Sequence, residues 1–251
     1  MYLDNSPKRH PCNKKLRLFY EPSFNGCAIQ YVGGFPMVTN YLEKLQQVIQ
    51  LACYNYRRVY AVRIDLRFPQ FGVDPALFSG NACLKKFFTY LQREIDASRL
   101  KYQTKVFYVW AREQNTSEHP HYHLLILLNY DSICGIGNYS PSVGGGYEAE
   151  NLYHRMVRSW SKAIGVPSEL AGGLVNICKK PFTNDIAQFT ITNEYNNTQY
   201  NELFHASSYL CKAHSKNFAQ QVHCFGSSQT RGLSSYEGNL ANCIANQHMD
   251  W

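Results

Sequence analysis

The sequence lacks a long hydrophobic run, a closely spaced cysteine pair and a phosphate-binding glycine motif. No stretch approaches the ~20 apolar residues of a membrane span, and residues 1–20 carry basic residues without the apolar segment of a signal peptide. The nine cysteines are an odd number with no CxxC pair, which favours reduced thiols over a disulfide framework or a zinc cluster. We therefore expect a cytoplasmic protein with no membrane partner. The motif GxxxxGK(S/T) is also absent, so the chain has no evident helicase motor.

Acidic residues are fewer than basic ones. The chain has 251 residues, of which 45% are hydrophobic, so it is long enough to bury a sizeable core. Lys and Arg together number 25 against 18 Asp and Glu, which gives a formal charge of +7. This balance favours a polyanionic partner such as nucleic acid, although many basic proteins bind none.

Hydrophobic spacing predicts an α+β protein. Residues 1–34 are rich in turn formers and are expected to form an irregular basic arm, residues 35–231 to form the folded domain, and residues 232–251 to form a tail. Residues 184–201 are rich in Asn and Thr, and no element is assigned before a helix that starts near Leu203. Periodicity predicts helices over 36–58, 81–100 and 151–165, and strands over 59–68, 104–114, 120–130 and 173–179.

Three histidines alternate in the stretch EHPHYHLLILLN, residues 118–129. In a strand, His121 and His123 lie on one face, and Glu113 lies opposite His121 if the loop 115–119 is symmetrical. Two imidazoles and one carboxylate leave coordination positions open, as a catalytic metal ion requires. The alternative is that the histidines only face solvent or bond to the backbone. His119 belongs to the loop and is expected to be a surface residue that helps a nucleic-acid contact.

The strand at 59–68 has one polar face. Arg63 and Arg67 lie on this face with Asp65 between them, and we expect the face to line the same sheet surface as the metal. The two guanidinium groups would then contact phosphates of a bound strand. The alternative is an ion-paired ladder on a solvated face. We also expect Arg112 and Lys216 to contact nucleic acid.

The stretch REQNTSEHPHYHLLILLN resembles the second motif of the HUH endonucleases, in which two histidines flank a bulky residue and hold a divalent metal, often with a glutamate on the preceding strand. The order of the surrounding segments is similar to that of inovirus-type replication proteins of filamentous phages and related integrated elements, over about residues 40–228. The resemblance implies Mg²⁺ or Mn²⁺ as cofactor. It also implies an antiparallel sheet of the RRM or palm type, with the metal site on one face and helices packed on the other. The segments are RVYAVRIDLRFP, VWAREQ, HPHYHLLILLN, GLVNI and FHASSYLCKAHSK.

The same resemblance implies a nucleophilic tyrosine on a helix with a lysine three positions later, and Tyr209 and Lys212 have this form. Residues three apart share a helix face, so both could reach one phosphate. The implied enzyme nicks single-stranded DNA at a replication origin, which leaves a 5′-phosphotyrosyl intermediate and a free 3′-hydroxyl for rolling-circle replication. It later rejoins the ends. A host or separately encoded helicase and polymerase in a bacterial cell are the implied partners.

Other functions stay open at this point. An HUH transposase-like strand transferase would use the same residues. A metal-dependent hydrolase would use the histidines with a water nucleophile and would not need Tyr209, since a tyrosine in an amphipathic helix is more often a packing residue. A nucleic-acid-binding module without catalysis would need neither the metal nor the tyrosine.

Overall fold

The computed structural model describes residues 6–31, 35–72, 74–114, 119–192, 197–214, 216 and 222–229. The expected tail and the loop residues 115–118 lie outside this part of the chain. Among the described helices, none combines the length and the apolar character that a membrane crossing requires.

The described elements mix strands and helices, which confirms the α+β class. Short 3₁₀ turns occupy Pro75–Phe78, Gly172–Leu174 and Tyr209–Cys211. The strands and α-helices are β1 (Arg9–His10), β2 (Asn13–Phe19), β3 (Ser23–Phe24), β4 (Cys27–Ala28), β5 (Met37–Val38), α1 (Thr39–Asn55), β6 (Arg58–Leu66), α2 (Ala82–Ala97), β7 (Phe107–Glu113), β8 (His121–Asn129), α3 (Leu152–Ile164), α4 (Ser168–Ala171), β9 (Val175–Ile177), β10 (Gln188–Thr192), α5 (Asn197–Ser208) and β11 (Phe225–Ser227).

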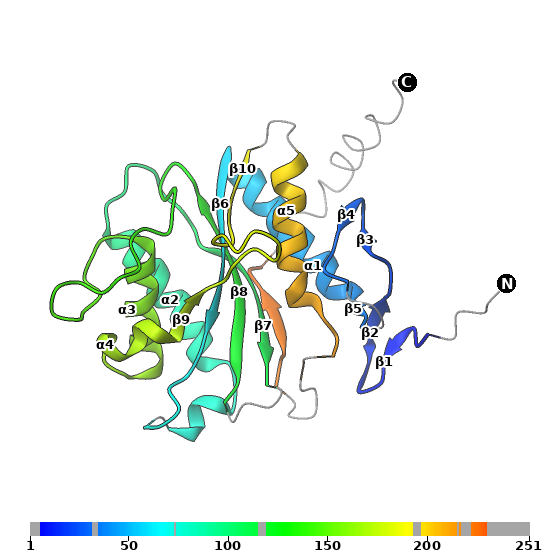
Figure 1. The fold of residues 1–251 in the computed structure, drawn as a ribbon, viewed down its shortest axis with the longest axis horizontal. Helices are drawn as coiled ribbons and strands as arrows, with labels where there is room; N and C mark the ends of the chain where they lie inside the picture. Colours follow the sequence, from blue (N-terminus) through cyan, green and yellow to red (C-terminus); the bar gives the residue numbers. More distant parts are fainter. Residues whose placement is uncertain are drawn as a thin grey trace.

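An antiparallel sheet forms the centre of the molecule, in the order β10-β6-β8-β7-β11 (Figure 1). β8 is its middle strand and pairs with β6 on one side and β7 on the other. β9 and β10 occupy successive halves of the free edge of β6, because β10 pairs with residues 58–62 and β9 with residues 64–66. At one end of the sheet β6 and β7 finish and β8 begins, and this end carries the predicted metal ligands.

One face of the sheet is covered by α2 and α3 (Figure 1). The alternate residues of β6 and β8 that face these helices are apolar and fully buried, and Trp160 of α3 packs among them. The Trp160 indole also donates a hydrogen bond of 2.7 Å to the backbone oxygen of Arg67. The facing strand residues are Tyr60, Val62, Ile64, Leu66, Tyr122, Leu124, Ile126 and Leu128.

The opposite face is covered by α1 and α5 (Figure 1). The expectation of helices on only one face is therefore wrong, and the alternative of a solvated polar face on the strand at 59–68 is excluded. Every residue of β6 after Arg58 is buried, because Ala61 and its neighbours on this face pack against Leu45 and Phe204 of the two helices. The polar residues of this face thus lie between the sheet and α5.

The N-terminal region is not the irregular arm that its composition predicts. β1, β2 and β5 form a small antiparallel sheet, and β3 and β4 form a hairpin. Phe24 and Cys27 of this hairpin are buried in the same core as α1 and α5. The backbone N–H of Gln30 donates a hydrogen bond of 2.8 Å to Ser208 Oγ at the end of α5. This region is therefore part of the folded domain.

The polar segment 184–201 contains a strand and the start of a helix. β10 pairs with β6 throughout its length, and its Phe189 and Ile191 enter the core beneath α5. α5 begins at Asn197 rather than near Leu203, and it ends at Ser208. Neither element was predicted from the polar sequence of this segment, because few of its residues are apolar and contact the core.

A substitution at Gly226 tests how β11 packs against β7 at the edge of the sheet. It pairs directly with Trp110 of β7, and a methyl carbon added there would lie 2.6 Å from Trp110 Cζ2. We expect Gly226→Ala to lower the free energy of unfolding by about 1–3 kcal/mol, because the indole must move out of a packed position. Urea denaturation of the full chain measures this. Gly135→Ala is the control, since no atom lies within 4 Å of an added carbon there, and equal loss in both variants would contradict the packing role.

Candidate active site

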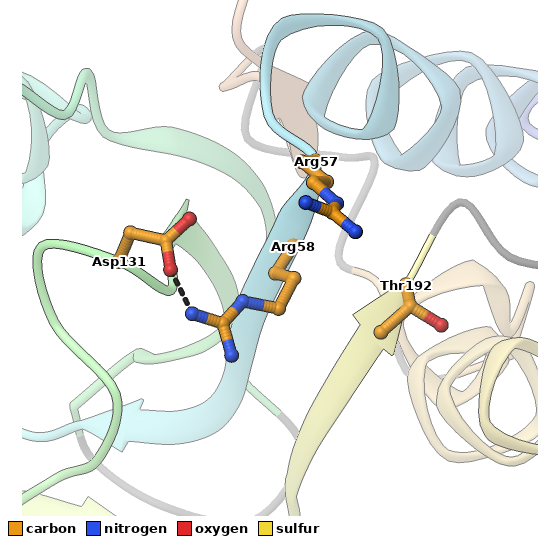
Figure 2. A pocket seen from close by; sticks show the side chains of 4 residues that line it. All are labelled: Arg57, Arg58, Asp131 and Thr192. Atoms are coloured by element: carbon orange, nitrogen blue, oxygen red, sulfur yellow. Dashed lines mark hydrogen bonds and ion pairs between the residues drawn. The ribbon is translucent and has the colours of Figure 1, made fainter.

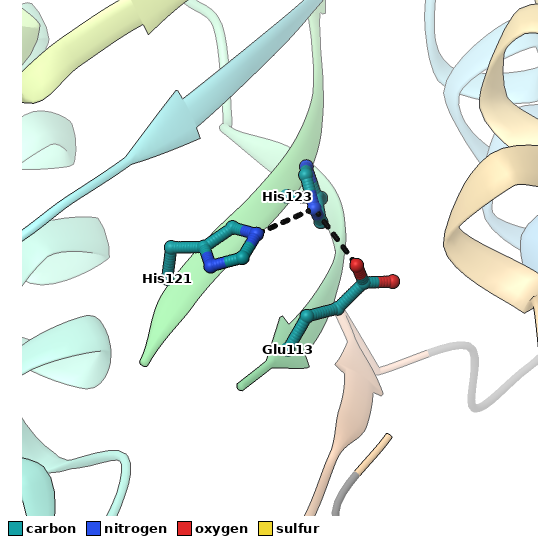
Figure 3. Close-up of side chains that lie close together, drawn as sticks. All are labelled: Glu113, His121 and His123. Atoms are coloured by element: carbon teal, nitrogen blue, oxygen red, sulfur yellow. Dashed lines mark hydrogen bonds and ion pairs between the residues drawn. The ribbon is translucent and has the colours of Figure 1, made fainter. Parts of the chain in front are cut away.

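Strand register brings the predicted metal ligands together. Glu113, the last residue of β7, pairs with His121 at the start of β8. His123 pairs with Ala111 on that side and with Asp65 of β6 on the other. The side chains of Glu113, His121 and His123 point toward one another on the face that carries α1 and α5, so the opposed-residue prediction for Glu113 and His121 is confirmed (Figure 3).

Glu113, His121 and His123 form a group that could hold a metal ion, with ligand atoms that all lie within 4.8 Å of one another. His123 Nε2 is 3.1 Å from His121 Nε2 and 3.2 Å from Glu113 Oε2 (Figure 3). Neighbouring ligand atoms that are each about 2.1 Å from one ion in octahedral geometry are about 3.0 Å apart. The spacing and the nitrogen and oxygen donors therefore fit a divalent ion.

Asp65 orients His123. The ring Nδ1 lies 2.6 Å from Asp65 Oδ1, so a proton on Nδ1 leaves the lone pair of Nε2 directed at the other two ligands. Burial alone lowers the pKa of His123, but its hydrogen bonds to Asp65 and Glu113 and the charges of these two carboxylates together raise it. Burial alone raises the pKa of Asp65, but the hydrogen bonds from His123 and Cys178 and the charges of His123 and Arg63 together lower it. The Cys178 thiol also donates to Asp65 Oδ1, at 3.2 Å.

Lys216 lies behind Glu113 and has no exposed side-chain surface. Its ammonium group is 3.8 Å from Glu113 Oε1 and donates a hydrogen bond of 2.7 Å to the backbone oxygen of Lys212. The expectation that Lys216 contacts nucleic acid is therefore wrong, because its charge is enclosed in the protein. The Lys216 ammonium group instead lies against Oε1 of Glu113, while Oε2 faces the histidines.

Tyr209 lies over the ligand group. It follows α5 directly, and its ring is 5.0 Å from the His123 ring at an angle of 73°. Lys212 is not on the same helix face as predicted, because the 3₁₀ turn ends at Cys211 and Lys212 is extended, with φ −56° and ψ 139°. Its ammonium group still reaches the tyrosine, at 3.6 Å from the ring centroid. The structure therefore brings Tyr209 and Lys212 to the predicted metal ligands.

The Tyr209 phenol is held in its neutral form by this environment. Burial raises its pKa, the carboxylates of Glu113 and Asp65 raise it further, and Arg63 acts in the opposite direction. The Lys212 pKa is lowered, chiefly by burial. Any group that adds positive charge beside the ring would therefore favour the phenolate.

The other predicted basic residues separate into different positions. Arg63 is buried, with its guanidinium carbon 5.6 Å from the Tyr209 ring centroid, and it donates a hydrogen bond to the backbone oxygen of Ala206 in α5. Arg112 is buried on the opposite face of the sheet and donates to the backbone oxygen of Phe78 at 2.8 Å. Both were expected to contact nucleic acid, and burial excludes this for Arg112 and leaves Arg63 a support for Tyr209. Arg67 is exposed at the end of β6, where its contact stays a prediction.

His119 packs beside the site rather than standing free. Its ring stacks on Phe78, with centroids 4.3 Å apart, and its Nε2 lies 3.2 Å from the backbone oxygen of Gln70. The ring is partly exposed, so its expected nucleic-acid contact stays a prediction.

A cavity of about 260 Å³ lies at the far end of β6, lined by Arg57, Arg58, Asp131 and Thr192 (Figure 2). Asp65 lies seven positions after Arg58 along the strand, which corresponds to roughly 23 Å. Arg58 and Asp131 form an ion pair across the cavity, so much of its charge is compensated internally. This cavity is distinct from the histidine site.

Residues 22–228 match the family model described as the YagK/YfjJ C-terminal domain. The chain belongs to this family. It is 28% identical over 210 residues to "Uncharacterized protein YagK" of Escherichia coli (strain K12), with 75% of this chain and 93% of the relative covered. It is 22% identical over 209 residues to "Uncharacterized protein YfjJ" of the same organism, with 76% of this chain and 95% of the relative covered. No solved structure matches the chain.

The YagK/YfjJ match spans every residue of the site, from Arg63 to Lys216. Sequence reasoning placed Asp65 on the same sheet surface as the metal but did not foresee its hydrogen bond to His123. The signal was present, because an aspartate on a strand that pairs with the histidine strand can face an imidazole. Nothing local in the sequence pointed to Cys178 or to the burial of Lys216.

The role of Asp65 can be tested without any catalytic assay. We expect Asp65→Asn to weaken Mn²⁺ binding by about 10- to 100-fold, because the neutral amide no longer fixes the His123 ring as a carboxylate does. Calorimetric titration of the full chain with Mn²⁺ measures the affinity. Asp96→Asn is the matched control, since Asp96 is exposed on α2. Equal affinities of Asp65→Asn and the unmodified chain would rule out this orienting role.

Proposed function

We propose that this chain is a metal-dependent single-strand DNA endonuclease and strand transferase of the HUH type, with an HUH-type fold, that initiates rolling-circle replication. The observation that carries the proposal is the position of Tyr209, whose ring lies 5.0 Å from the ring of His123 in the ligand group. A nucleophile beside two imidazoles and a carboxylate is the arrangement that transfer of a phosphoryl group to tyrosine requires.

Glu113, His121 and His123 are the residues that would hold the ion, as Mg²⁺ or Mn²⁺. When bound, such an ion supplies positive charge that stabilises the non-bridging oxygens of a scissile phosphate. Asp65 keeps the His123 ring in the orientation that this binding needs. Lys216 restrains Glu113 from behind, so that one carboxylate oxygen stays directed at the imidazoles.

Tyr209 is the proposed nucleophile. Its phenolic oxygen loses a proton and forms a bond to the scissile phosphorus, while the bond from phosphorus to the 3′-oxygen breaks and that oxygen takes up a proton. Lys212, 3.6 Å from the ring centroid, and Arg63, 5.6 Å from it, stabilise negative charge on the phenolate. The products are a 5′-phosphotyrosyl protein and a free 3′-hydroxyl.

The covalent intermediate conserves the phosphodiester bond for rejoining. A 3′-hydroxyl that attacks the phosphotyrosyl bond restores the DNA strand and frees Tyr209. This chemistry suits initiation at an origin, with the polymerase and helicase supplied by the host cell or encoded separately. A transposase-like strand transferase would use the same two steps on a different DNA sequence.

The role of Tyr209 as the nucleophile can be tested by removing its phenolic oxygen. We expect Tyr209→Phe to form no denaturation-resistant adduct with single-stranded DNA in Mn²⁺, because the variant retains the ring but has no oxygen to attack phosphorus. Gel electrophoresis under denaturing conditions detects the adduct. Tyr200→Phe is the matched control, since Tyr200 lies on α5, the helix that precedes Tyr209, packs against the α1/α5 core, and its variant should form the adduct normally.

Two results would contradict the assignment of Tyr209. An adduct in Tyr209→Phe means that another residue is the nucleophile, and peptide mapping identifies it. Cleavage without an adduct in any variant means that water attacks the phosphate and that the chain is a metal-dependent hydrolase.

Variants of the two histidines can distinguish DNA cleavage from DNA binding. We expect His121→Ala and His123→Ala each to abolish cleavage but to keep most of the affinity for single-stranded DNA, because phosphate contacts by basic side chains do not depend on the ion. Cleavage gels and fluorescence anisotropy measure the two properties. Thermal unfolding checks that the variants are folded, and full nicking by the double variant would exclude the site.

A further inference from the structure

The chain between β9 and β10 leaves the sheet edge as a hairpin that spans residues 178–187. Lys179 and Ile186 form an isolated antiparallel bridge at its base. Within the hairpin, the backbone N–H of Lys180 donates to the oxygen of Asp185 at 2.7 Å, and that of Ala187 donates to the oxygen of Cys178 at 2.8 Å. The hairpin is therefore an ordered projection. Its tip carries Phe182.

The tip of the hairpin lies against α5. The Phe182 ring stacks on the ring of His205, with centroids 5.5 Å apart and an angle of 24° between the planes. Lys180 forms an ion pair of 3.3 Å with Glu202, one turn earlier on the same helix. Figure 1 shows this segment beside α5, between β9 and β10. These contacts fix the position of Phe182 relative to the helix.

The hairpin is connected to the candidate active site at both ends. Cys178 at its base donates a hydrogen bond to Asp65, which orients His123. His205, under its tip, precedes Tyr209 by four residues, so the two side chains lie about one helical turn apart on one face. Phe182 therefore lies about one turn of helix from the proposed nucleophile.

Most of the surface of Phe182 is exposed to solvent. Its exposed fraction is 86%, although its ring is already stacked on an imidazole. A single exposed aromatic residue needs no explanation by itself. Here, however, the ring is held against a partner, and the exposed Lys179 lies in the same hairpin. A fixed aromatic face and an exposed cation on one projection are suited to bind unpaired bases and their phosphates.

We propose that the hairpin 178–187 is a single-stranded DNA contact, in which Phe182 stacks on an unpaired base close to the scissile phosphate and Lys179 contacts the backbone. This inference rests on the proposed function for the identity of the substrate. It adds a binding surface outside the metal and tyrosine group. Because every base has a stacking face, the contact holds the strand without selecting its sequence.

The test measures binding in the absence of catalysis. The full chain is titrated with fluorescein-labelled oligothymidylate in EDTA, and fluorescence anisotropy reports the affinity. We expect Phe182→Ala to bind about tenfold more weakly or worse, and Phe182→Trp to bind about as well as the unmodified chain, because base stacking on an aromatic ring is lost only in the first. Tyr139→Ala is the matched control, an exposed aromatic residue that contacts Tyr153 of α3 on the far side of the sheet.

A second probe distinguishes stacking from other effects. An abasic oligonucleotide with the same sugar-phosphate chain should bind Phe182→Ala and the unmodified chain equally. Equal affinity of the two proteins for oligothymidylate would overturn the proposal, and so would an unchanged difference between them on the abasic chain. A dimer in sedimentation velocity that disappears in Phe182→Ala would assign this surface to a second copy of the chain and overturn it as well.

The outcome is separable from that of the proposed function. If Phe182→Ala weakens binding but no Tyr209 adduct forms, the DNA contact stands and the proposed chemistry fails. If the adduct forms and the loss of Phe182 changes nothing, only the hairpin contact fails. If the unmodified chain binds no single-stranded DNA, both fail.

Discussion

The pairing of β8 with both of its neighbours is the constraint on which the site depends. In its observed register, β8 places His121 and His123 toward α1 and α5, and Tyr122 and Leu124 toward α2 and α3. A shift of one residue would exchange the two sets. Tyr122 and Leu124 have no exposed surface, and burial of such a side chain contributes about 1.5–3 kcal/mol. Apolar packing therefore fixes the register, and the register assembles the polar group.

The polar group is stable inside the protein because each buried carboxylate has positive or hydrogen-bonding partners. Asp65 accepts from His123 and Cys178, and Glu113 lies between His123 and the buried Lys216. An unpaired buried charge would cost several kcal/mol. The pKa shifts agree with this compensation of charge, because the pKa of Asp65 is lowered and that of His123 is raised despite burial. Removal of either partner would leave a charge without compensation, so the ligand group and its supports form one electrostatic unit.

The sequence predicted the parts of this site that depend on local pattern. Strand alternation and a short loop were enough to place Glu113 opposite His121. Positions that depend on contacts distant in the chain were not predictable. Arg112 and Lys216 were expected to contact nucleic acid, but both are buried by elements distant in the sequence, and burial of charged residues is rare. The same limit hid β10, whose pairing partner lies more than a hundred residues earlier.

Tyr209 and the metal ligands are held by different parts of the molecule. The ligands depend on the sheet, whereas the tyrosine depends on the end of α5, where Leu210 and Cys211 enter the core and Gln30 bonds to Ser208. Under the proposed function, a substrate phosphate has to enter between the Tyr209 and His123 rings, whose centroids are 5.0 Å apart. Arg63 of β6 links the two parts, because it contacts the Tyr209 ring and also donates a hydrogen bond to Ala206 of α5. The hydrogen bond from the Gln30 backbone N–H to Ser208 then ties the N-terminal region to the residue directly before Tyr209, so this region supports the position of Tyr209.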